Sequence, residues 1–197
     1  MPDIWAIILA AGESKRMGSP KMLLPFGGKT LIEKVIENVV SSRAGNTIVV
    51  LGSSADEILD RIEVLPVRHC YNENYSEGML SSVKCGFSKL PEKYDAAIVL
   101  PGDYPGIGAG VINMLIESFS ESSKKIVIPL FRGKRGHPIL ISYQLREEVM
   151  RLSPEKGLRE LMEKFPVDVL EVELNDQAVL KDIDTIDDYM NELKQIT

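Results

Sequence analysis

Residues 4–21 read IWAIILAAGESKRMGSPK, a short apolar run followed at once by small residues and then by basic ones. Residues 4–9 are rich in isoleucine, which is typical of a strand buried in a parallel sheet. Ligands of open α/β sheets bind just beyond the carboxyl ends of such strands, and small residues there let backbone N–H groups approach phosphate oxygens. The segment therefore predicts an α/β protein with a phosphate site after its first strand, unless its charges belong only to a solvated loop.

Apolar runs of the same kind recur along the chain. They cover residues 47–51, 66–70, 96–100 and 125–129. Between them, apolar residues recur every three to four positions, as on the buried face of a helix. This alternation predicts a Rossmann-like, doubly wound and mainly parallel sheet with right-handed crossovers.

The C-terminal third departs from this alternation. Basic residues between two glycines lead into another apolar run, which predicts a small hairpin or sheet extension, and the alternating pattern at 167–174 predicts an edge strand. Ser153 followed by Pro154 predicts a helix start, and a last helix is expected from about Thr185. No linker or repeat divides the chain, so we expect a single domain over residues 1–197.

The composition limits the classes of partner. The chain has 197 residues, of which 44% are hydrophobic and 26% charged, and its formal net charge is −6. Such a charge gives no general attraction to nucleic acid or to an anionic membrane. The first apolar run is too short for a signal peptide or a membrane span, so a cytoplasmic protein is expected. Cys70 and Cys85 lack a CxxC spacing or nearby histidines, which predicts two reduced thiols.

Two cations, Arg16 and Lys21, stand in the loop that follows the first strand. They could neutralise a triphosphate and the charge that develops at its α-phosphorus, which is most of what a protein supplies in phosphoryl-type transfer. A Walker A loop would need glycine at position 23, which is leucine, and Gly12 and Gly18 do not fit the spacing GxGxxG. The sequence therefore favours neither a P-loop NTPase nor a dinucleotide-binding dehydrogenase.

Aspartates follow two other predicted turns. Asp103 comes after an apolar strand and beside Gly102, where a hard carboxylate oxygen could hold Mg²⁺ against the triphosphate. Asp184 could be a second ligand, or it could belong to the start of the last helix, since Thr185 and Asp188 have the spacing of a capping box. The other acidic residues of this stretch are expected to be solvated: Asp182, Asp187 and Asp188.

Two further segments could shape a site for the acceptor. Residues 77–82 open a helix, so the hydroxyls of Ser81 and Ser82 could meet a phosphate or a base edge, or could simply cap the helix. Residues 132–138 bring three cations and His137 beside two glycines. His137 could form a hydrogen bond to a substrate or remain a neutral structural donor.

Five segments carry a resemblance to a known family. They read LAAGESKRMGSPKMLLPFGGKTLIE at 9–33, YSEGMLSSVKCG at 75–86, LPGDYPGI at 100–107, GKRGHPILIS at 133–142 and DIDTIDDY at 182–189. In this order they resemble the molybdenum cofactor cytidylyltransferases, a branch of the MobA-like NTP transferases, which implies the fold of nucleotide-diphospho-sugar transferases. The family often carries a GDxGxR-like turn where residues 153–159 read SPEKGLR, so that only Gly157 and Arg159 remain of it.

The resemblance implies that the terminal phosphate of Mo-molybdopterin attacks the α-phosphate of CTP with Mg²⁺, or Mn²⁺ in its place, giving molybdopterin cytosine dinucleotide and pyrophosphate. It implies catalytic roles for Arg16, Lys21 and Asp103, and metal binding by Asp103 and Asp184. Contacts with nucleotide or acceptor are implied for a further set: Leu9, Ala10, Ala11, Gly12, Gly78, Met79, Ser81, Ser82, Gly102 and His137. A molybdenum oxidoreductase or its chaperone is implied as a transient partner.

Two alternatives stay open at this level. A nucleotidyltransferase acting on a sugar or alcohol phosphate would share the same loop, because the loop recognises the NTP. A non-catalytic carrier or insertion chaperone of the molybdenum cofactor would not need a metal at the α-phosphate, so the combination of Arg16, Lys21 and Asp103 favours an enzyme. Ala11 points to CTP, since guanylyl-transferring relatives tend to read LAGG where this chain reads LAAG at 9–12.

Overall fold

The computed structural model describes residues 2–15 and 17–196, except for the side chains of residues 195 and 196. Within these residues, eight strands form one sheet and two short strands pair apart from it. The strands are β1 (Ile4–Ala10), β2 (Pro25–Phe26), β3 (Lys29–Thr30), β4 (Asn46–Leu51), β5 (Arg68–Tyr71), β6 (Ala96–Pro101), β7 (Ile126–Phe131), β8 (Lys134–Arg135), β9 (Ile139–Ser142) and β10 (Val169–Glu173). The helices are α1 (Leu31–Val40), α2 (Ala55–Ile62), α3 (Met79–Ser88), α4 (Ala109–Ser120), α5 (Arg146–Arg151), α6 (Leu158–Lys164) and α7 (Ile186–Ile196).

The strand order of the sheet is β10-β7-β9-β6-β1-β4-β5, with β8 paired to β7. β1 runs parallel to both β4 and β6, and β4 runs parallel to β5. β9 runs antiparallel to β6 and β7, β8 closes a hairpin on β7, and β10 pairs parallel with β7 at the edge. The predicted Rossmann-like, mainly parallel sheet, with a hairpin and an edge strand in the C-terminal third, is confirmed.

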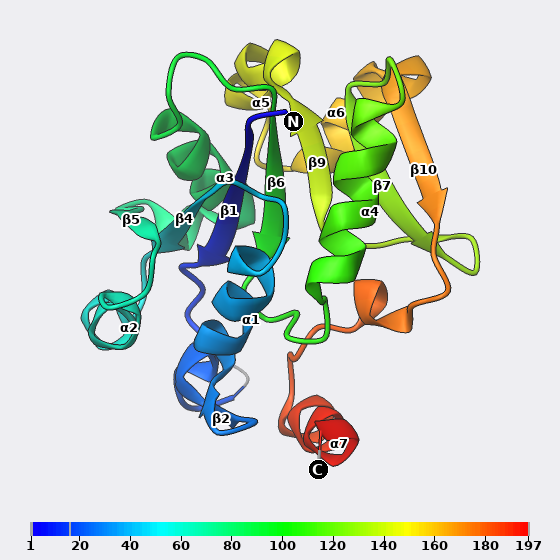
Figure 1. Cartoon of the computed structure of the whole chain (residues 1–197). Helices are drawn as coiled ribbons and strands as arrows, with labels where there is room; N and C mark the ends of the chain where they lie inside the picture. Colours follow the sequence, from blue (N-terminus) through cyan, green and yellow to red (C-terminus); the bar gives the residue numbers. More distant parts are fainter. Residues whose placement is uncertain (1, 16, 197) are drawn as a thin grey trace.

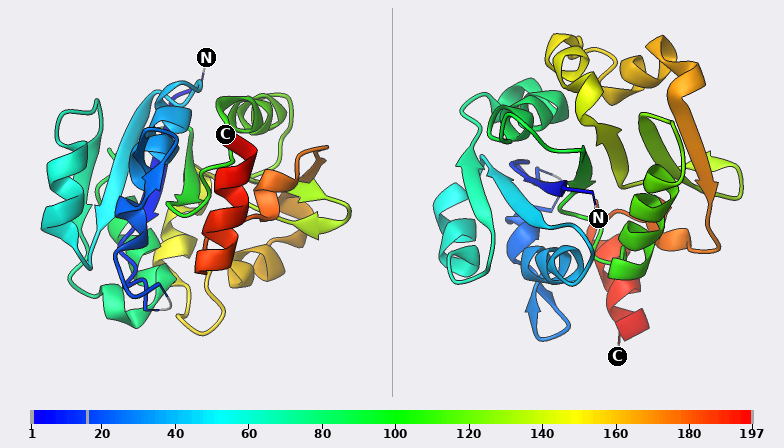
Figure 2. Two further views of the ribbon diagram at one scale, coloured as in Figure 1. Left: turned by 90° about the horizontal axis from the view of Figure 1, so that it is seen from below. Right: turned by 45° about the horizontal axis from the view of Figure 1, so that its top comes forward.

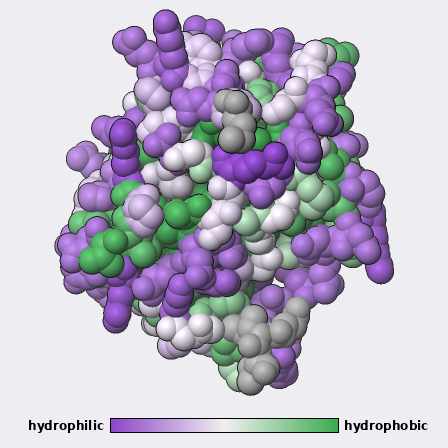
Figure 3. Space-filling model, viewed as in Figure 1, coloured by the Kyte–Doolittle hydropathy of each residue, from purple (hydrophilic) through white to green (hydrophobic). Residues whose placement is uncertain are grey.

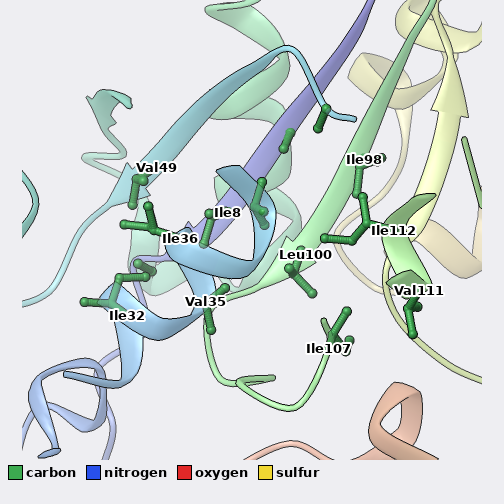
Figure 4. Packing of buried hydrophobic residues seen from close by; sticks show 14 of the residues in the cluster. Ile8, Ile32, Val35, Ile36, Val49, Ile98, Leu100, Ile107, Val111 and Ile112 are labelled. Carbon is green, nitrogen blue, oxygen red and sulfur yellow. The ribbon is translucent and has the colours of Figure 1, made fainter. Parts of the chain in front are cut away.

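Two hydrophobic clusters pack on opposite faces of the sheet, because side chains alternate along each strand. In β1, Ile4 and Ile8 belong to one cluster, whereas Trp5 and Ile7 belong to the other. Helices α1 and α4 cover the first face, where their apolar side chains meet those of β1, β4 and β6 (Figure 4). Helices α3, α5 and α6 contribute to the other cluster. Both faces of β1 are therefore buried, which explains its unbroken apolar sequence.

The helix start predicted at Ser153 is wrong. Helix α6 begins only at Leu158, and Gly157 precedes it with a φ of 59°. The backbone N–H of Ser153 donates to Glu160 Oε2 at 2.9 Å, so residues 153–157 form a turn in front of the helix. Residues 154–157 of this turn line a cavity.

The start of α7 is as predicted. The helix begins one residue after Thr185. Asp188 Oδ2 accepts from the Thr185 backbone N–H at 2.8 Å, and the Thr185 hydroxyl accepts from the Asp188 N–H at 3.2 Å. This is the predicted capping box.

The surface is mostly hydrophilic on the face shown in Figure 3, with smaller hydrophobic areas between the polar ones. The most exposed apolar side chains, Val64 and Val167, come from separate segments of the chain. Among the described residues, none of the helices combines the length and the apolar character that crossing a bilayer requires.

The carboxyl ends of β1 and β6 lie at the same end of the sheet, the lower end in Figure 1. The loop after β1, the turn after β6 and the segment before α7 come together at this end, which the left view of Figure 2 shows from below. Segments far apart in the sequence are thus brought to the place where open α/β sheets bind ligands.

Candidate functional site

One lysine and two aspartates from distant parts of the chain meet at this end of the sheet. Lys21 Nζ donates to Asp103 Oδ2 at 2.6 Å, to Asp184 Oδ1 at 3.0 Å and to the carbonyl oxygen of Ile183 at 3.1 Å. The side chains of Lys21, Asp103 and Asp184 are 11%, 17% and 29% exposed. Burial lowers the pKa of Lys21, but the two carboxylates outweigh it and raise the pKa above its ordinary value. The ammonium group is therefore held charged between them.

The loop after β1 places Lys21. Ser14 has a φ of 52°, and its hydroxyl accepts from the Lys21 backbone N–H at 3.1 Å. The carbonyl oxygen of Ser14 accepts from the N–H of Met17 at 2.9 Å, which folds the loop back on itself. Met22 is buried in the core next to Lys21 and anchors the turn. Arg16 lies outside the described residues, so its role in this loop stays a prediction.

Asp103 follows β6 in a turn that packs closely against β1. The N–H of Gly102 donates to the carbonyl oxygen of Leu9 at 2.8 Å. A Cβ atom at position 102 would lie 3.0 Å from that oxygen and 3.0 Å from the sulfur of Met22, so a larger residue would push the turn away. Because residue 102 is glycine, the turn can lie against β1 and bring Asp103 to the end of that strand. The carbonyl group of Leu9 accepts the hydrogen bond that holds the turn there.

The segment before α7 contributes two carboxylates to the site. Ile183 is fully buried, and its N–H donates to the carbonyl oxygen of Asp103 at 2.9 Å, which fixes the two aspartates that flank it. The prediction that Asp182 is solvated is wrong. One oxygen from each of Asp103, Asp182 and Asp184 lies within 4.8 Å of the other two, and Asp182 is half-buried. Burial raises the pKa of Asp182, and the charges of Asp184 and Asp103 add to the shift. We call these three residues the acidic triad.

The acidic triad has the donor chemistry of a divalent cation site. Hard cations such as Mg²⁺ take oxygen ligands, and one or two protein carboxylates suffice because Mg²⁺ retains several waters. Asp103 Oδ2 accepts from Lys21, whereas Asp103 Oδ1 is buried and has no hydrogen-bond partner among the described residues. A buried acceptor of this kind is costly unless something else satisfies it. A cation beside Asp103 would satisfy it.

A pocket of about 240 Å³ lies between the loop after β1 and the acidic triad. It is lined by Gly12, Glu13, Ser14, Lys15, Met17, Lys21 and Asp184. Leu9, Ala10 and Ala11 are at most 7% exposed, so they support this pocket from behind and its accessible wall begins at Gly12. We call it the loop pocket.

Asn72, which the sequence did not single out, ties β5 to the first turn of α3. Its Nδ2 donates to the hydroxyls of Ser81 at 2.8 Å and Ser82 at 3.0 Å, and the residue is 6% exposed. The Ser81 hydroxyl also lies 2.8 Å from the carbonyl oxygens of Gly78 and Asn74, to one of which it donates. The two serines are thus engaged within the protein and fix the start of α3. The available signal was an amide side chain directly after a strand.

A larger cavity of about 590 Å³ lies between the start of α3, β9 and the turn before α6. It is lined by Met79, Leu80, Val83, Ile128, Arg135, Gly136, His137, Ile139, Pro154, Glu155, Lys156, Gly157, Leu158, Arg159, Met162 and Glu163. Apolar side chains form much of the wall, which also carries three cations, Arg135, Lys156 and Arg159, and two carboxylates, Glu155 and Glu163. Lys156 is paired with Glu163 at 2.6 Å, and Arg135 is paired with Glu171 at 2.6 Å. A largely apolar wall with a few polar groups is typical of a small-molecule site.

His137 connects this cavity with the acidic triad. It lines the cavity, and its ring packs against Tyr104 with the ring centroids 5.0 Å apart. Burial lowers the pKa of His137, although the charge of Asp103 acts in the opposite direction. His137 Nδ1 is buried without a hydrogen-bond partner among the described residues. Burial therefore favours the neutral form of the imidazole between the two parts of the site.

The predicted site residues fall into two neighbouring groups. Gly12, Lys21 and Asp184 meet at the loop pocket, with Asp103 beside them. Met79 and His137 line the larger cavity, while Gly78, Ser81 and Ser82 form the first turn of α3 behind Met79.

Comparisons with known proteins identify the family of the chain. Residues 6–170 match the MobA-like NTP transferase domain. Nicotine blue oxidoreductase from Paenarthrobacter nicotinovorans is 30% identical over 195 residues, covering 95% of each chain. Molybdenum cofactor cytidylyltransferase from Escherichia coli K12 is 28% identical over 198 residues, covering 100% of this chain and 99% of that one. The crystal structure of a homologue of Mycobacterium tuberculosis rv0371c, from Mycobacterium sp. strain JC1, superposes with a TM-score of 0.87 at 28% identity, covering 98% of this chain and 96% of that one.

Proposed function

Because the chain belongs to the MobA-like NTP transferase family, we propose that residues 1–197 act as one domain that transfers the cytidylyl group of CTP to Mo-molybdopterin. The products are molybdopterin cytosine dinucleotide and pyrophosphate. The observation that carries this proposal is the position of Lys21, which lies 2.6 Å from Asp103 and 3.0 Å from Asp184 at the rim of the loop pocket. A cation and carboxylates at the end of β1 are suited to a metal-bound triphosphate.

Asp103 and Asp184 would hold Mg²⁺, for which Mn²⁺ can substitute, and Asp182 lies close enough to contribute a third oxygen. When bound, the cation supplies positive charge to the phosphate oxygens and so lowers the repulsion that opposes attack at the α-phosphorus. Once a cation occupies the carboxylates, the ammonium group of Lys21 is available for the phosphates. Lys21 then stabilises the charge that develops at the α-phosphorus.

The loop after β1 would position the triphosphate through the backbone N–H groups that begin at Gly12. The larger cavity would hold the acceptor, since its largely apolar wall carries one more cation than carboxylates and adjoins the triad through His137. A neutral His137 can donate to the acceptor phosphate without adding a charge to the site. No general base is needed on that phosphate, because its oxygens are already nucleophilic.

Of the two relatives described above, one is named as an oxidoreductase and the other as a cytidylyltransferase. Oxidoreductase activity is therefore a second candidate function. An oxidoreductase uses a hydride or electron carrier, and the protein then serves mainly to orient it. Three carboxylates within 4.8 Å of one another suit a cation and a triphosphate better than they suit hydride transfer. The acidic triad therefore favours the transferase.

The decisive assay incubates the protein with each NTP, Mg²⁺, inorganic pyrophosphatase and one acceptor at a time. We expect phosphate release with CTP and Mo-molybdopterin. Phosphate release only with a sugar or alcohol phosphate would mean that the protein is a nucleotidyltransferase with a different acceptor. Oxidation of an added hydride donor by nicotine blue, without phosphate release from any NTP and acceptor, would indicate an oxidoreductase in place of the transferase. Tight binding of the cytosine dinucleotide without turnover would indicate a carrier.

The base preference gives a separate prediction. We expect kcat/KM for CTP to exceed that for GTP by at least about tenfold, and Ala11→Gly to narrow this gap. Ala11 is 3% exposed and its carbonyl oxygen accepts from the N–H of Ser53 at 3.1 Å, so its methyl group acts by restricting the backbone rather than by touching the base. Steady-state kinetics of both nucleotides with one acceptor measure the ratio. Equal values for CTP and GTP in the unmodified protein would contradict the preference.

A further inference from the structure

The two cysteines, 15 positions apart in the sequence, lie side by side in the fold. Cys70 Sγ and Cys85 Sγ are 3.6 Å apart, one on β5 and the other on α3. Both are free thiols. A disulfide requires a sulfur separation of about 2.0 Å, so small side-chain rotations would bring the two atoms into bonding range. Neither spacing nor composition indicated this pair.

The two thiols differ in accessibility. Cys70 is 6% exposed, whereas Cys85 is only half-buried and its thiol donates to the carbonyl oxygen of Tyr71 at 3.3 Å. Burial and the neighbouring Cys85 raise the pKa of Cys70 to about 12. An external reagent therefore meets Cys85 first, and Cys70 is placed to react second, from within the protein.

The backbone around the pair is held in place. Gly86, next to Cys85, lets α3 pack directly on β1, since a Cβ atom there would overlap the side chain of Ile7. Asn72, two residues after Cys70, is bonded to Ser81 and Ser82 on α3. Packing and hydrogen bonds thus hold the two segments beside each other before any covalent link forms.

We propose that Cys70 and Cys85 form a redox-active dithiol that closes reversibly to a disulfide and fastens β5 to α3. The oxidant is a low-molecular-weight disulfide. The thiolate of Cys85 attacks one of its sulfur atoms, releasing one thiol and leaving a mixed disulfide on Cys85. The sulfur of Cys70 then attacks the sulfur of Cys85 and displaces the second small thiol. The protein loses two electrons and two protons, which reduce the small disulfide to the two thiols that are released.

The test treats the folded, reduced protein with glutathione disulfide and measures its intact mass, followed by peptide mapping without reduction. We expect the wild type to lose two hydrogen atoms and to yield a peptide pair joined through Cys70 and Cys85. Cys70→Ser should stop at one glutathione on Cys85, because the second thiol is missing. Cys85→Ser should stay unmodified, because Cys70 is buried. A wild type that keeps glutathione on Cys85 without forming the internal bond would overturn the proposal, and this result does not depend on either variant folding.

Thermal unfolding tests whether the native fold accommodates the bond. Closing a loop of 15 residues should raise the Tm of the oxidised wild type by roughly 5 to 10 °C, and dithiothreitol should reverse the shift. A lower Tm after oxidation would show that the bond distorts the fold and would contradict the proposal. Disulfide formation does not require the nucleotidyl transfer proposed above, so the two can fail separately.

Discussion

Asp103→Asn should lower turnover by roughly 10²- to 10³-fold and should remove most of the response to Mg²⁺. The amide keeps the shape of the side chain but loses the charge that holds a cation. The carboxylate of Asp103 has one oxygen on Lys21 and one buried oxygen without a hydrogen-bond partner among the described residues. The substitution replaces one of these oxygens by an NH2 group and leaves the other as an uncharged carbonyl oxygen. Its backbone contact with Ile183 is unaffected, so the fold should survive. Mg²⁺ titrations of pyrophosphate release measure the effect.

Binding provides a readout that does not depend on turnover. CTP with Mg²⁺ at about 100 times its dissociation constant should stabilise the wild type by about 2.7 kcal/mol, or roughly 5 to 10 °C in Tm. The shift should be much smaller in Asp103→Asn. Asp187→Asn is a matched control, because Asp187 is an exposed aspartate in the first turn of α7 and lies outside the acidic triad. Equal Tm shifts in the wild type and Asp103→Asn would mean that Asp103 is only a turn residue.

The sheet could be predicted because its signals are local. The unbroken apolar runs of β1, β4, β6 and β7 mark strands buried on both faces, and each is confirmed within a residue or two. The antiparallel insertion of β9 between β6 and β7 could not be predicted in the same way. Its position depends on pairing between residues distant in the sequence, such as Ala96 with Ser142. The start of α6 was predicted wrongly because Ser153 and Pro154 have the sequence pattern of a helix start but lie in a turn. The residue before the helix is Gly157, which has no side chain to cap it.

The candidate site shows the same division. Lys21, Asp103 and Asp184 could be selected because each follows a predicted strand or precedes a predicted helix. In the sequence, Asp182 is indistinguishable from a solvated aspartate at the start of a helix. Its orientation toward the site depends on the burial of the neighbouring Ile183, which only the structure shows. Asn72 was missed for a related reason. Its position directly after a strand can be read from the sequence, but its hydrogen bonds to Ser81 and Ser82 across a turn cannot.

Lys21→Ala should lower kcat by roughly 10²- to 10³-fold, because it removes a preorganised charge that serves the transition state. The structure adds an effect on stability that depends on the metal. Without a cation, the variant leaves Asp103, Asp182 and Asp184 within 4.8 Å of one another and without the ammonium group of Lys21. We expect the Tm without Mg²⁺ to fall by roughly 2 to 10 °C.

Excess Mg²⁺ should restore most of the lost stability of Lys21→Ala but none of its turnover, since the cation replaces the charge of Lys21 between the carboxylates and not at the α-phosphorus. The pKa of Lys21 is raised, so its contribution to stability is complete below the ordinary lysine pKa of about 10.4 and is lost only as the pH rises through the raised value. The Tm difference between wild type and variant should therefore stay constant from pH 6 to 9. Lys29→Ala, which breaks an exposed ion pair with Glu37, is the matched control and should change neither turnover nor the Mg²⁺ response. Normal turnover in Lys21→Ala would remove this lysine from the reaction and leave it a structural partner of the acidic triad.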